Sequence, residues 1–193
     1  MVVIFDLDGT LTRPMLDFDR IRAEIGIPSG PILEAIKLMN LDQRPRAESI
    51  LYRHEKHAAE NAALRPGAAE TINFLRTRGL RVGILTRNAR RWASLILSNH
   101  ALVVDALHTR DDGPVKPSPD GVFSLIKTFN ADPSRSWIVG DYLFDIQAGR
   151  AAGLTTVLLF GDRAPPSYAH QADHLICTFP ELLPLVLGPG AYQ

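Results

Sequence analysis

Short apolar runs alternate with helical patterns along most of the chain. The run Val2-Val3-Ile4-Phe5 predicts a buried strand, and from Pro66 onward similar runs are separated by stretches of the length that parallel crossovers need. Further strands are expected at residues 82–85, 102–104, 137–139, 155–160 and 175–176. This alternation predicts an α/β fold with a Rossmann-like, doubly wound parallel sheet.

Helical patterns fill the intervals between these runs, at residues 68–78, 89–98, 119–129 and 143–152. Gly79 and Gly153 are expected to end the first and the last of them. Ser118 and Pro119 have the chemistry of a helix N-cap and a first helical residue. These helices supply the crossovers that a parallel sheet requires.

The segment 14–64 interrupts this alternation, because it carries no strand signal. Apolar residues recur at helical spacing around residues 18–25 and 32–39, and a third, more polar helical stretch covers 47–64. We therefore expect a core domain of residues 1–13 and 65–193 and a helical cap domain of residues 14–64. Both joints border the end of the first strand, so the cap is predicted to act as a lid.

Composition places the chain among globular proteins. Its 193 residues are 46% hydrophobic, which is enough to fill a core. Lys and Arg total 21, and so do Asp and Glu, so neither nucleic acid nor an anionic membrane surface is an expected partner. No apolar run approaches the ~20 residues of a membrane span. Cys177 is the single cysteine and no signal segment precedes Val2, so the cytoplasm is the expected compartment.

Two carboxylates follow the first strand directly, in Asp6-Leu7-Asp8-Gly9-Thr10. Ligands of open α/β sheets bind outside the carboxyl ends of the strands, so this pair is placed to hold a metal, attack an electrophile or move a proton. Asp, Gly and Thr are also ordinary turn formers, and a capped turn is the alternative interpretation.

Three further polar clusters follow later elements. Thr86-Arg87-Asn88 comes directly after the strand 82–85, where a hydroxyl and backbone N–H groups favour anion binding, although Thr86 is equally suited to cap a helix. Lys116 lies in a loop between two prolines. Asp141 and Asp145 follow the strand 137–139, so a second pair of acids is expected at the same edge of the sheet.

Together the four clusters resemble the motifs of the haloacid dehalogenase superfamily, in its phosphoglycolate phosphatase-like branch with a small helical cap. Asp6, Asp8, Gly9 and Thr10 match the first motif and Thr86 the second. Lys116, followed by Pro117, matches the third, and Asp141 with Asp145 matches the fourth. The resemblance covers nearly the whole chain.

The resemblance implies a Mg²⁺-dependent phosphatase that acts on a small phosphorylated metabolite. Asp6 would be the nucleophile that forms an aspartyl-phosphate, and Asp8 the general acid and base. Mg²⁺ would be held by Asp6, the backbone carbonyl of Asp8 and Asp141, with Asp145 in support. Thr86 and Lys116 would stabilise the transferring phosphoryl group. Further phosphate or substrate contacts would come from Gly9, Thr10, Arg87, Asn88 and Arg13.

Two other functions use similar residues. A sugar phosphomutase of the same fold keeps the acid at Asp8 and relies on its cap to exclude water, but a cap of about 50 residues is short for that task. A phospho-accepting regulatory protein also uses an aspartate, Mg²⁺, Thr and Lys, but it carries no helical insertion after its first strand. We therefore rank hydrolysis first.

The cap is where the chain departs from the family pattern. Arg13-Pro14 follows the first motif in place of the usual acidic or small residues, and Arg13 is a candidate for contacting a second anionic group of the substrate. His54 and His57 lie three positions apart on a polar helix, where a solvated face is the more common outcome than a metal site. The sequence does not reveal the natural substrate or the oligomeric state.

Overall fold

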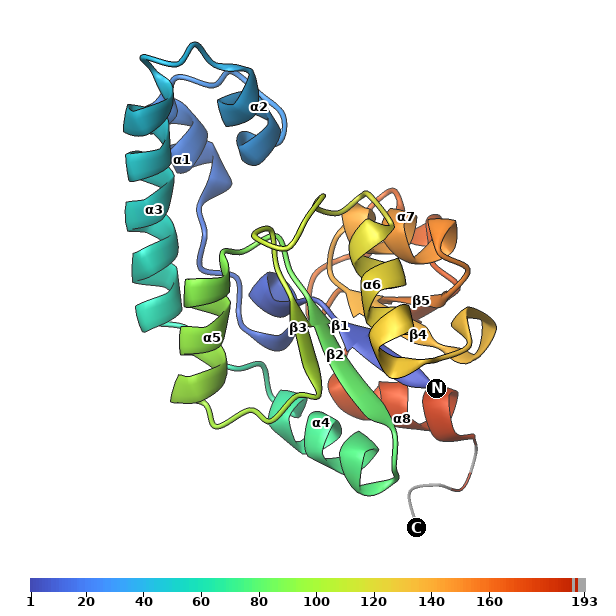
Figure 1. The fold of residues 1–193 in the computed structure, drawn as a ribbon. Coiled ribbons are helices and arrows are strands. Elements are labelled where there is room, and N and C mark those ends of the chain that lie inside the picture. Colours follow the sequence, from blue (N-terminus) through green and yellow to red (C-terminus); the bar gives the residue numbers. More distant parts are fainter. Residues whose placement is uncertain (189, 191–193) are drawn as a thin grey trace. The chain divides into compact units, whose positions relative to one another are not determined.

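A single parallel sheet of six strands organises the larger part of the chain. The computed structural model describes residues 1–188 and 190. Its strand order is β3-β2-β1-β4-β5-β6, and every neighbouring pair is parallel (Figure 1). The strands are β1 (Val2–Phe5), β2 (Arg81–Leu85), β3 (Ala106–His108), β4 (Trp137–Gly140), β5 (Thr155–Leu159) and β6 (His174–Ile176). The prediction of an α/β, doubly wound parallel sheet is confirmed.

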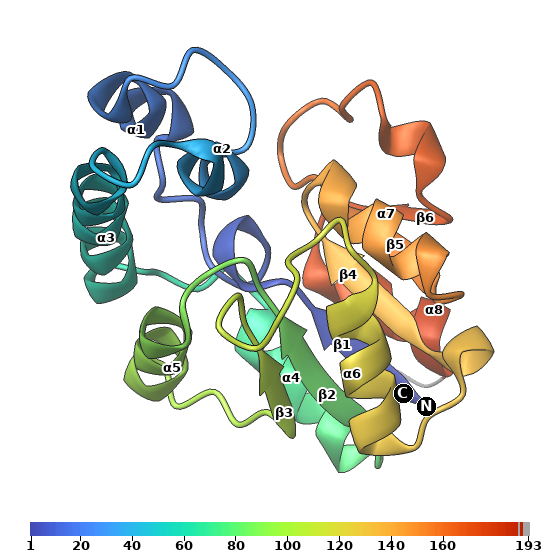
Figure 2. The same ribbon diagram turned by 45° about the horizontal axis from the view of Figure 1, so that its top comes forward.

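Helices cover both faces of this sheet, as Figure 2 shows. All four residues of β1 are fully buried, which explains why the strand is apolar without alternation. One core cluster joins β1, β2 and β4 to α6 and α7, so these two helices share a face. The helices of this part are α4 (Ala68–Thr77), α5 (Arg90–Asn99), α6 (Asp120–Phe129), α7 (Leu143–Ala151) and α8 (Leu182–Leu187).

The expected strand at 102–104 is wrong, because that segment ends α5 instead. Ala101 adopts a left-handed φ of 49°, and the Leu102 N–H donates to the Leu97 carbonyl at 2.9 Å. Pairing with β2 begins only at Asp105, whose N–H donates to the Val82 carbonyl at 2.8 Å. The apolar run therefore caps a helix, and the strand follows it as β3.

The start of α6 differs by one residue from the expectation. Pro119 occupies the N-cap position and the helix begins at Asp120. Ser118 still contributes to this helix start, because its Oγ accepts a hydrogen bond from the Asp120 N–H at 3.4 Å.

The chain divides into two compact units, one formed by Met1–Pro14 with the chain from Ala63 onward, and the other by Met15–Ala62. The second unit contains α1 (Phe18–Ile25), α2 (Ile32–Leu38) and α3 (Arg44–Glu60) around a small cluster of isoleucines and other apolar residues. Asp17 caps α1 through the Arg20 N–H, and Gly26 ends the helix in a left-handed conformation. Among the residues described, no helix has the length and apolarity that crossing a bilayer requires.

The two connections that border the second unit pair with each other inside the first unit. Thr12 and Leu64 form an antiparallel bridge. The Arg13 N–H donates to the Ala63 carbonyl and the Arg65 N–H donates to the Leu11 carbonyl, both at 2.8 Å. This short ladder, formed by residues 11–13 and 63–65, is called the neck below.

Candidate active site

The carboxyl ends of β1 and β4 bring the first and the fourth polar clusters together. These strands are neighbours in the sheet, with Phe5 opposite Val139, and the Asp6 N–H donates to the Val139 carbonyl at 2.9 Å. Asp6 follows β1 directly, and Asp141 follows Gly140 at the end of β4. The strand register therefore places the two acids side by side, although they are far apart in the sequence.

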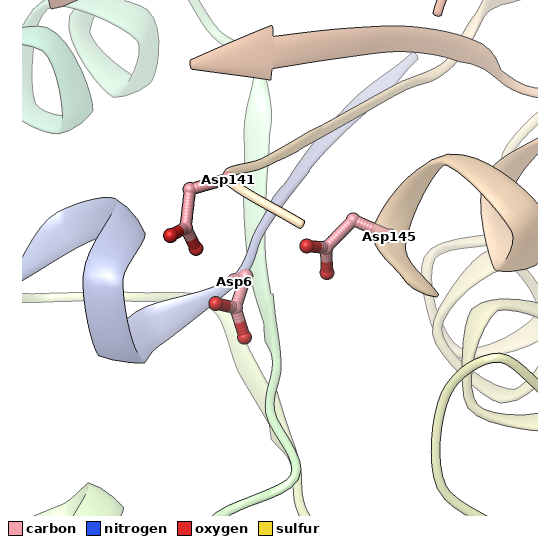
Figure 3. A group of neighbouring side chains, drawn as sticks. All are labelled: Asp6, Asp141 and Asp145. Carbon is pink, nitrogen blue, oxygen red and sulfur yellow. The ribbon is translucent and has the colours of Figure 1, made fainter. Parts of the chain in front are cut away.

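Asp6, Asp141 and Asp145 form a cluster of three carboxylates (Figure 3). Each offers an oxygen that lies within 4.8 Å of the oxygens of the other two. Burial and the negative charge of Asp6 raise the pKa of Asp141 to about 6. Hard oxygen ligands at this spacing suit Mg²⁺, so the residues fit the metal that the sequence predicts.

Lys116 balances part of this negative charge. Its ammonium group is buried, and Nζ donates to Asp6 Oδ1 at 2.6 Å and to Asp145 Oδ1 at 2.5 Å. Burial disfavours the charged ammonium, but the charges of Asp145 and Asp6 outweigh it and raise the pKa of Lys116 above the ordinary value. Lys116 is therefore a permanent cation in contact with the proposed nucleophile.

Asp145 is fixed through both of its oxygens. Oδ1 accepts from Lys116, and Oδ2 accepts from the Tyr142 N–H at 3.1 Å, which caps the start of α7. Burial is the main cause that raises the pKa of Asp145, to about 7. The helix start thus holds Asp145 in place beside Lys116.

The turn Leu7–Leu11 fits closely against Asp141. Gly9 has a φ of 88°, and a Cβ at this position would lie 2.6 Å from Asp141 Oδ2. The Thr10 hydroxyl lies 3.3 Å from Asp6 Oδ2 and 3.1 Å from Asp141 Oδ1. Glycine is required at position 9 both by the backbone and by the space that Asp141 occupies.

Asp8 makes its contacts with the second polar cluster. Asp8 Oδ2 accepts from the Asn88 side-chain amide at 3.0 Å and from the Thr86 hydroxyl at 3.4 Å. The Thr86 Oγ in turn accepts from the Asn88 N–H at 3.0 Å. The Asp8 carboxylate is thus oriented by residues that follow β2, and the three-carboxylate cluster among the described residues does not include it.

Arg87 and Arg13 occupy different surroundings. Arg87 donates through Nη1 to the Lys116 carbonyl and lies over the Phe144 ring, 5.1 Å from its centroid. It thereby braces the loop that carries Lys116. Arg13 is exposed on the neck, and its guanidinium makes no hydrogen bond to a residue that the structure describes.

The two cap histidines have separate partners. His54 Nε2 lies 3.1 Å from Glu24 Oε2, whereas His57 Nδ1 lies 3.4 Å from the Asn61 side-chain nitrogen. Neither belongs to a metal-type cluster within the described part of the chain.

Sequence reasoning missed Arg65, which it treated only as part of a helix-breaking triplet. The half-buried Arg65 donates through Nε to the Gly9 carbonyl at 2.8 Å. It thus ties the neck to the turn that carries Asp8. The sequence offered one signal, because Arg65 lies at the joint where the inserted segment returns to the core, near the expected end of the first strand.

Comparison with known sequences identifies the family. The sequence model described as haloacid dehalogenase-like hydrolase matches residues 20–153. A haloacid dehalogenase-like hydrolase domain-containing protein of Arabidopsis thaliana is 33% identical over 81% of this chain and 69% of its own length. A solved hydrolase from Pseudomonas syringae, 22% identical, covers 94% of this chain and 95% of its own with a TM-score of 0.81, which shows the same fold.

Two similar proteins are named as phosphatases. An N-acetylmuramic acid 6-phosphate phosphatase of Pseudomonas putida is 30% identical over 89% of this chain and 86% of its own length. A phosphoglycolate phosphatase of Pseudomonas syringae pv. tomato is 27% identical over 82% of this chain and 68% of its own. The resemblance seen in the sequence is confirmed: the chain belongs to the haloacid dehalogenase-like hydrolase family, in its phosphoglycolate phosphatase-like branch.

Proposed function

We propose that this hydrolase is a Mg²⁺-dependent phosphatase, which cleaves a small phosphomonoester through an aspartyl-phosphate on Asp6. The observation that carries the proposal is the pairing of Asp6 with the buried ammonium of Lys116 inside a cluster of carboxylates. Lys116 orients the Asp6 carboxylate through a direct hydrogen bond, and a nucleophile must be held in place in this way. Family membership and the phosphatase-named relatives support phosphomonoesters as substrates.

The two acids after β1 divide the chemistry between them. An Asp6 oxygen attacks phosphorus while the bond from phosphorus to the leaving oxygen breaks, and Asp8 gives that oxygen a proton. Asp8 then takes a proton from the water that attacks the aspartyl-phosphate and releases inorganic phosphate. The contacts of Asp8 with Thr86 and Asn88 support this separate role, because they differ from the contacts of Asp6 with Lys116 and Thr10.

The remaining residues position the phosphoryl group. Thr86, Lys116 and the N–H groups of the turn at Gly9 and Thr10 supply donors, with support from Arg87 and Asn88. Mg²⁺ held by Asp6, Asp141 and the Asp8 carbonyl, with Asp145 in support, would supply the positive charge that lets an anion approach an anion. Asp145 and Lys116 orient each other, so the metal ligands and the cation act as one unit.

The names of two relatives support a proposal for the substrate class. Phosphoglycolate and N-acetylmuramic acid 6-phosphate are both phosphoesters of carboxylic acids, by the names of the two phosphatases. We propose a phosphorylated small acid as substrate here.

The test is a phosphate-release screen over many phosphomonoesters in Mg²⁺ or EDTA. We expect release that requires Mg²⁺ and is abolished in Asp6→Asn, while Asp132→Asn, an exposed acid far along the chain, retains it. Acid-quenched protein should carry phosphate on Asp6, and Asp8→Ala should slow its loss. Undiminished turnover by Asp6→Asn would refute the nucleophile assignment.

A further inference from the structure

Three arginines gather around one edge of the candidate active site. Arg65 contacts the Gly9 carbonyl, and Arg163 Nη2 lies 3.6 Å from Asp141 Oδ2. Burial lowers the pKa of Arg65, and the like charges of Arg163 and Arg13 lower it further, so all three guanidinium groups share one electrostatic neighbourhood. All three belong to the unit that contains the sheet.

Arg65 is held firmly in this neighbourhood. Its Nε is fixed by the Gly9 carbonyl at 2.8 Å. On another side, Arg65 Nη1 lies close to Gly161, because a Cβ added to this glycine would be only 3.0 Å from Nη1. Gly161 has a φ of 64° and follows β5, so the end of that strand leaves the room that the guanidinium fills. The orientation of the Arg65 guanidinium is therefore fixed, although the residue is only partly buried.

Several N–H donors of the three arginines have no hydrogen-bond acceptor among the described residues. Within the described residues, Arg65 Nη1 and Nη2 and the whole Arg13 guanidinium make no hydrogen bond to protein. Arg163 donates one hydrogen bond, through Nε to the Phe160 carbonyl at 3.4 Å, besides its ion pair with Asp141. Two carboxylates, Asp141 and Asp162, face three positive charges. Clustered guanidinium groups repel one another, and an anion that accepts their hydrogen bonds removes this repulsion.

We propose that Arg65 and Arg163, with Arg13, form a second anion site that binds a carboxylate carried by the leaving group. The planar guanidinium fork matches a carboxylate in geometry and charge. Arg65 contacts the Gly9 carbonyl, so this anion site borders the turn that carries Asp8, the acid proposed to protonate the leaving oxygen. This inference rests on the proposed phosphatase function and specifies which esters it prefers.

Two esters that differ in one group test the site. Phosphoglycolate carries a carboxylate where 2-hydroxyethyl phosphate carries a neutral hydroxymethyl group. We expect Arg65→Gln and Arg163→Gln each to reduce the preference in kcat/KM for phosphoglycolate over the neutral ester about tenfold or more, mainly through KM. Arg65→Lys should restore part of the preference, since it keeps the charge.

Control variants distinguish a loss of carboxylate binding from a loss of local structure at the turn of Gly9. Arg135→Gln removes one exposed positive charge just before β4, at the opposite end of the strand from Asp141, and should leave both esters unaffected. If Arg65 only supports the turn at Gly9, its variant will lower kcat equally for both esters. Equal losses, or an unchanged preference in the Arg65→Gln/Arg163→Gln double variant, would overturn the second anion site.

A binding measurement keeps this inference distinct from the proposed chemistry. Calorimetric titration of Asp6→Asn with the two esters should show tighter binding of phosphoglycolate, and the difference should shrink when Arg163→Gln is added. Absence of hydrolysis by the wild type would refute the phosphatase, whereas equal binding of the two esters would refute the arginine site.

Discussion

The ammonium nitrogen of Lys116 lies 2.6 Å from Oδ1 of Asp6, although 110 positions separate the two residues in the sequence. A second contact, with Asp145, makes Lys116 the shared partner of two buried carboxylates. Removing the cation leaves both carboxylates without their counter-charge in a site with little access to water, which is among the most destabilising changes a protein undergoes.

Lys116→Met is therefore expected to affect both stability and turnover. We expect the free energy of unfolding to fall by about 3 kcal/mol in the metal-free protein, and phosphate release to fall at least about a hundredfold. Urea unfolding and initial rates measure the two effects. Lys127→Met, on the exposed side of α6, is the control and should change neither. A Lys116→Met variant with wild-type turnover would contradict the role assigned to the ion pair.

Gly9→Ala should inactivate the protein by displacing Asp141. The added methyl group would lie 2.6 Å from Asp141 Oδ2, in addition to the backbone strain at a φ of 88°. Gly79→Ala is a matched control, because Gly79 has a φ of 79° with nothing within 4 Å of the added Cβ. Both variants should lose about 1–2 kcal/mol of stability from backbone strain, but only Gly9→Ala should lose Mg²⁺-dependent turnover. Equal turnover in the two variants would contradict the steric argument.

Asn88→Asp tests the orientation of Asp8. The substitution keeps the side-chain oxygen that accepts from the Ala89 N–H at 2.8 Å, but it replaces the amide that donates to Asp8 with a second carboxylate. A like charge favours protonated Asp8, so the pH profile of kcat should shift to higher pH and kcat at neutral pH should fall about tenfold. Asn99→Asp, exposed in α5, provides the control. A profile that superimposes on that of the wild type would remove Asn88 from this role.

Asp141 makes the stability of the metal-free protein depend on pH. Its pKa of about 6, against an ordinary 3.8, means that the folded state holds a proton that the unfolded chain has already lost. Stability is therefore present at low pH and declines as pH rises from about 4 to about 6, by ~3 kcal/mol from this group. Urea unfolding in EDTA should show a steeper decline in the wild type than in Asp141→Asn, where the raised pKa of Asp145 still contributes a decline of its own. Equal slopes in the two proteins would contradict the assignment to Asp141.

Mg²⁺ binding should reverse the pH dependence of stability that Asp141 causes in the metal-free protein. Mg²⁺ binds the ionised carboxylate, so its stabilisation of the wild type should grow as pH rises through 6, and Asp141→Asn should respond little. A Mg²⁺ effect that is the same at pH 5 and pH 8 would argue against Asp141 as a ligand.

The alternation of strands and helices was predictable because a fully buried parallel sheet needs apolar strands and long crossovers. The segment 102–104 shows the limit of this reasoning. Leu102 and Val104 are apolar in either role, and only the left-handed Ala101, which no local pattern indicates, assigns them to a helix end. Burial alone does not distinguish a strand from a capping segment.

The candidate active site was also predictable in part: the residues that form it were identified, but their contacts were not. Residues that follow strands, such as Asp6, Thr86 and Asp141, were identified because strand ends converge in any parallel sheet. Which partner each side chain chooses was not predictable. The contact of Asn88 with Asp8 and that of Arg65 with Gly9 depend on loop conformations that bring together residues 80 and 56 positions apart.

The neck makes the stability of the sheet depend only weakly on the length of the segment inserted between its two strands. Because Thr12 and Leu64 are bridged, the residues between them form a closed loop whose two ends are held together next to the sheet. The entropic cost of closing such a loop rises by only about 0.6 kcal/mol for each doubling of its length. The sheet is therefore expected to tolerate replacement of α1, α2 and α3 by a shorter or a larger module, so this segment can vary while the residues at the strand ends stay the same.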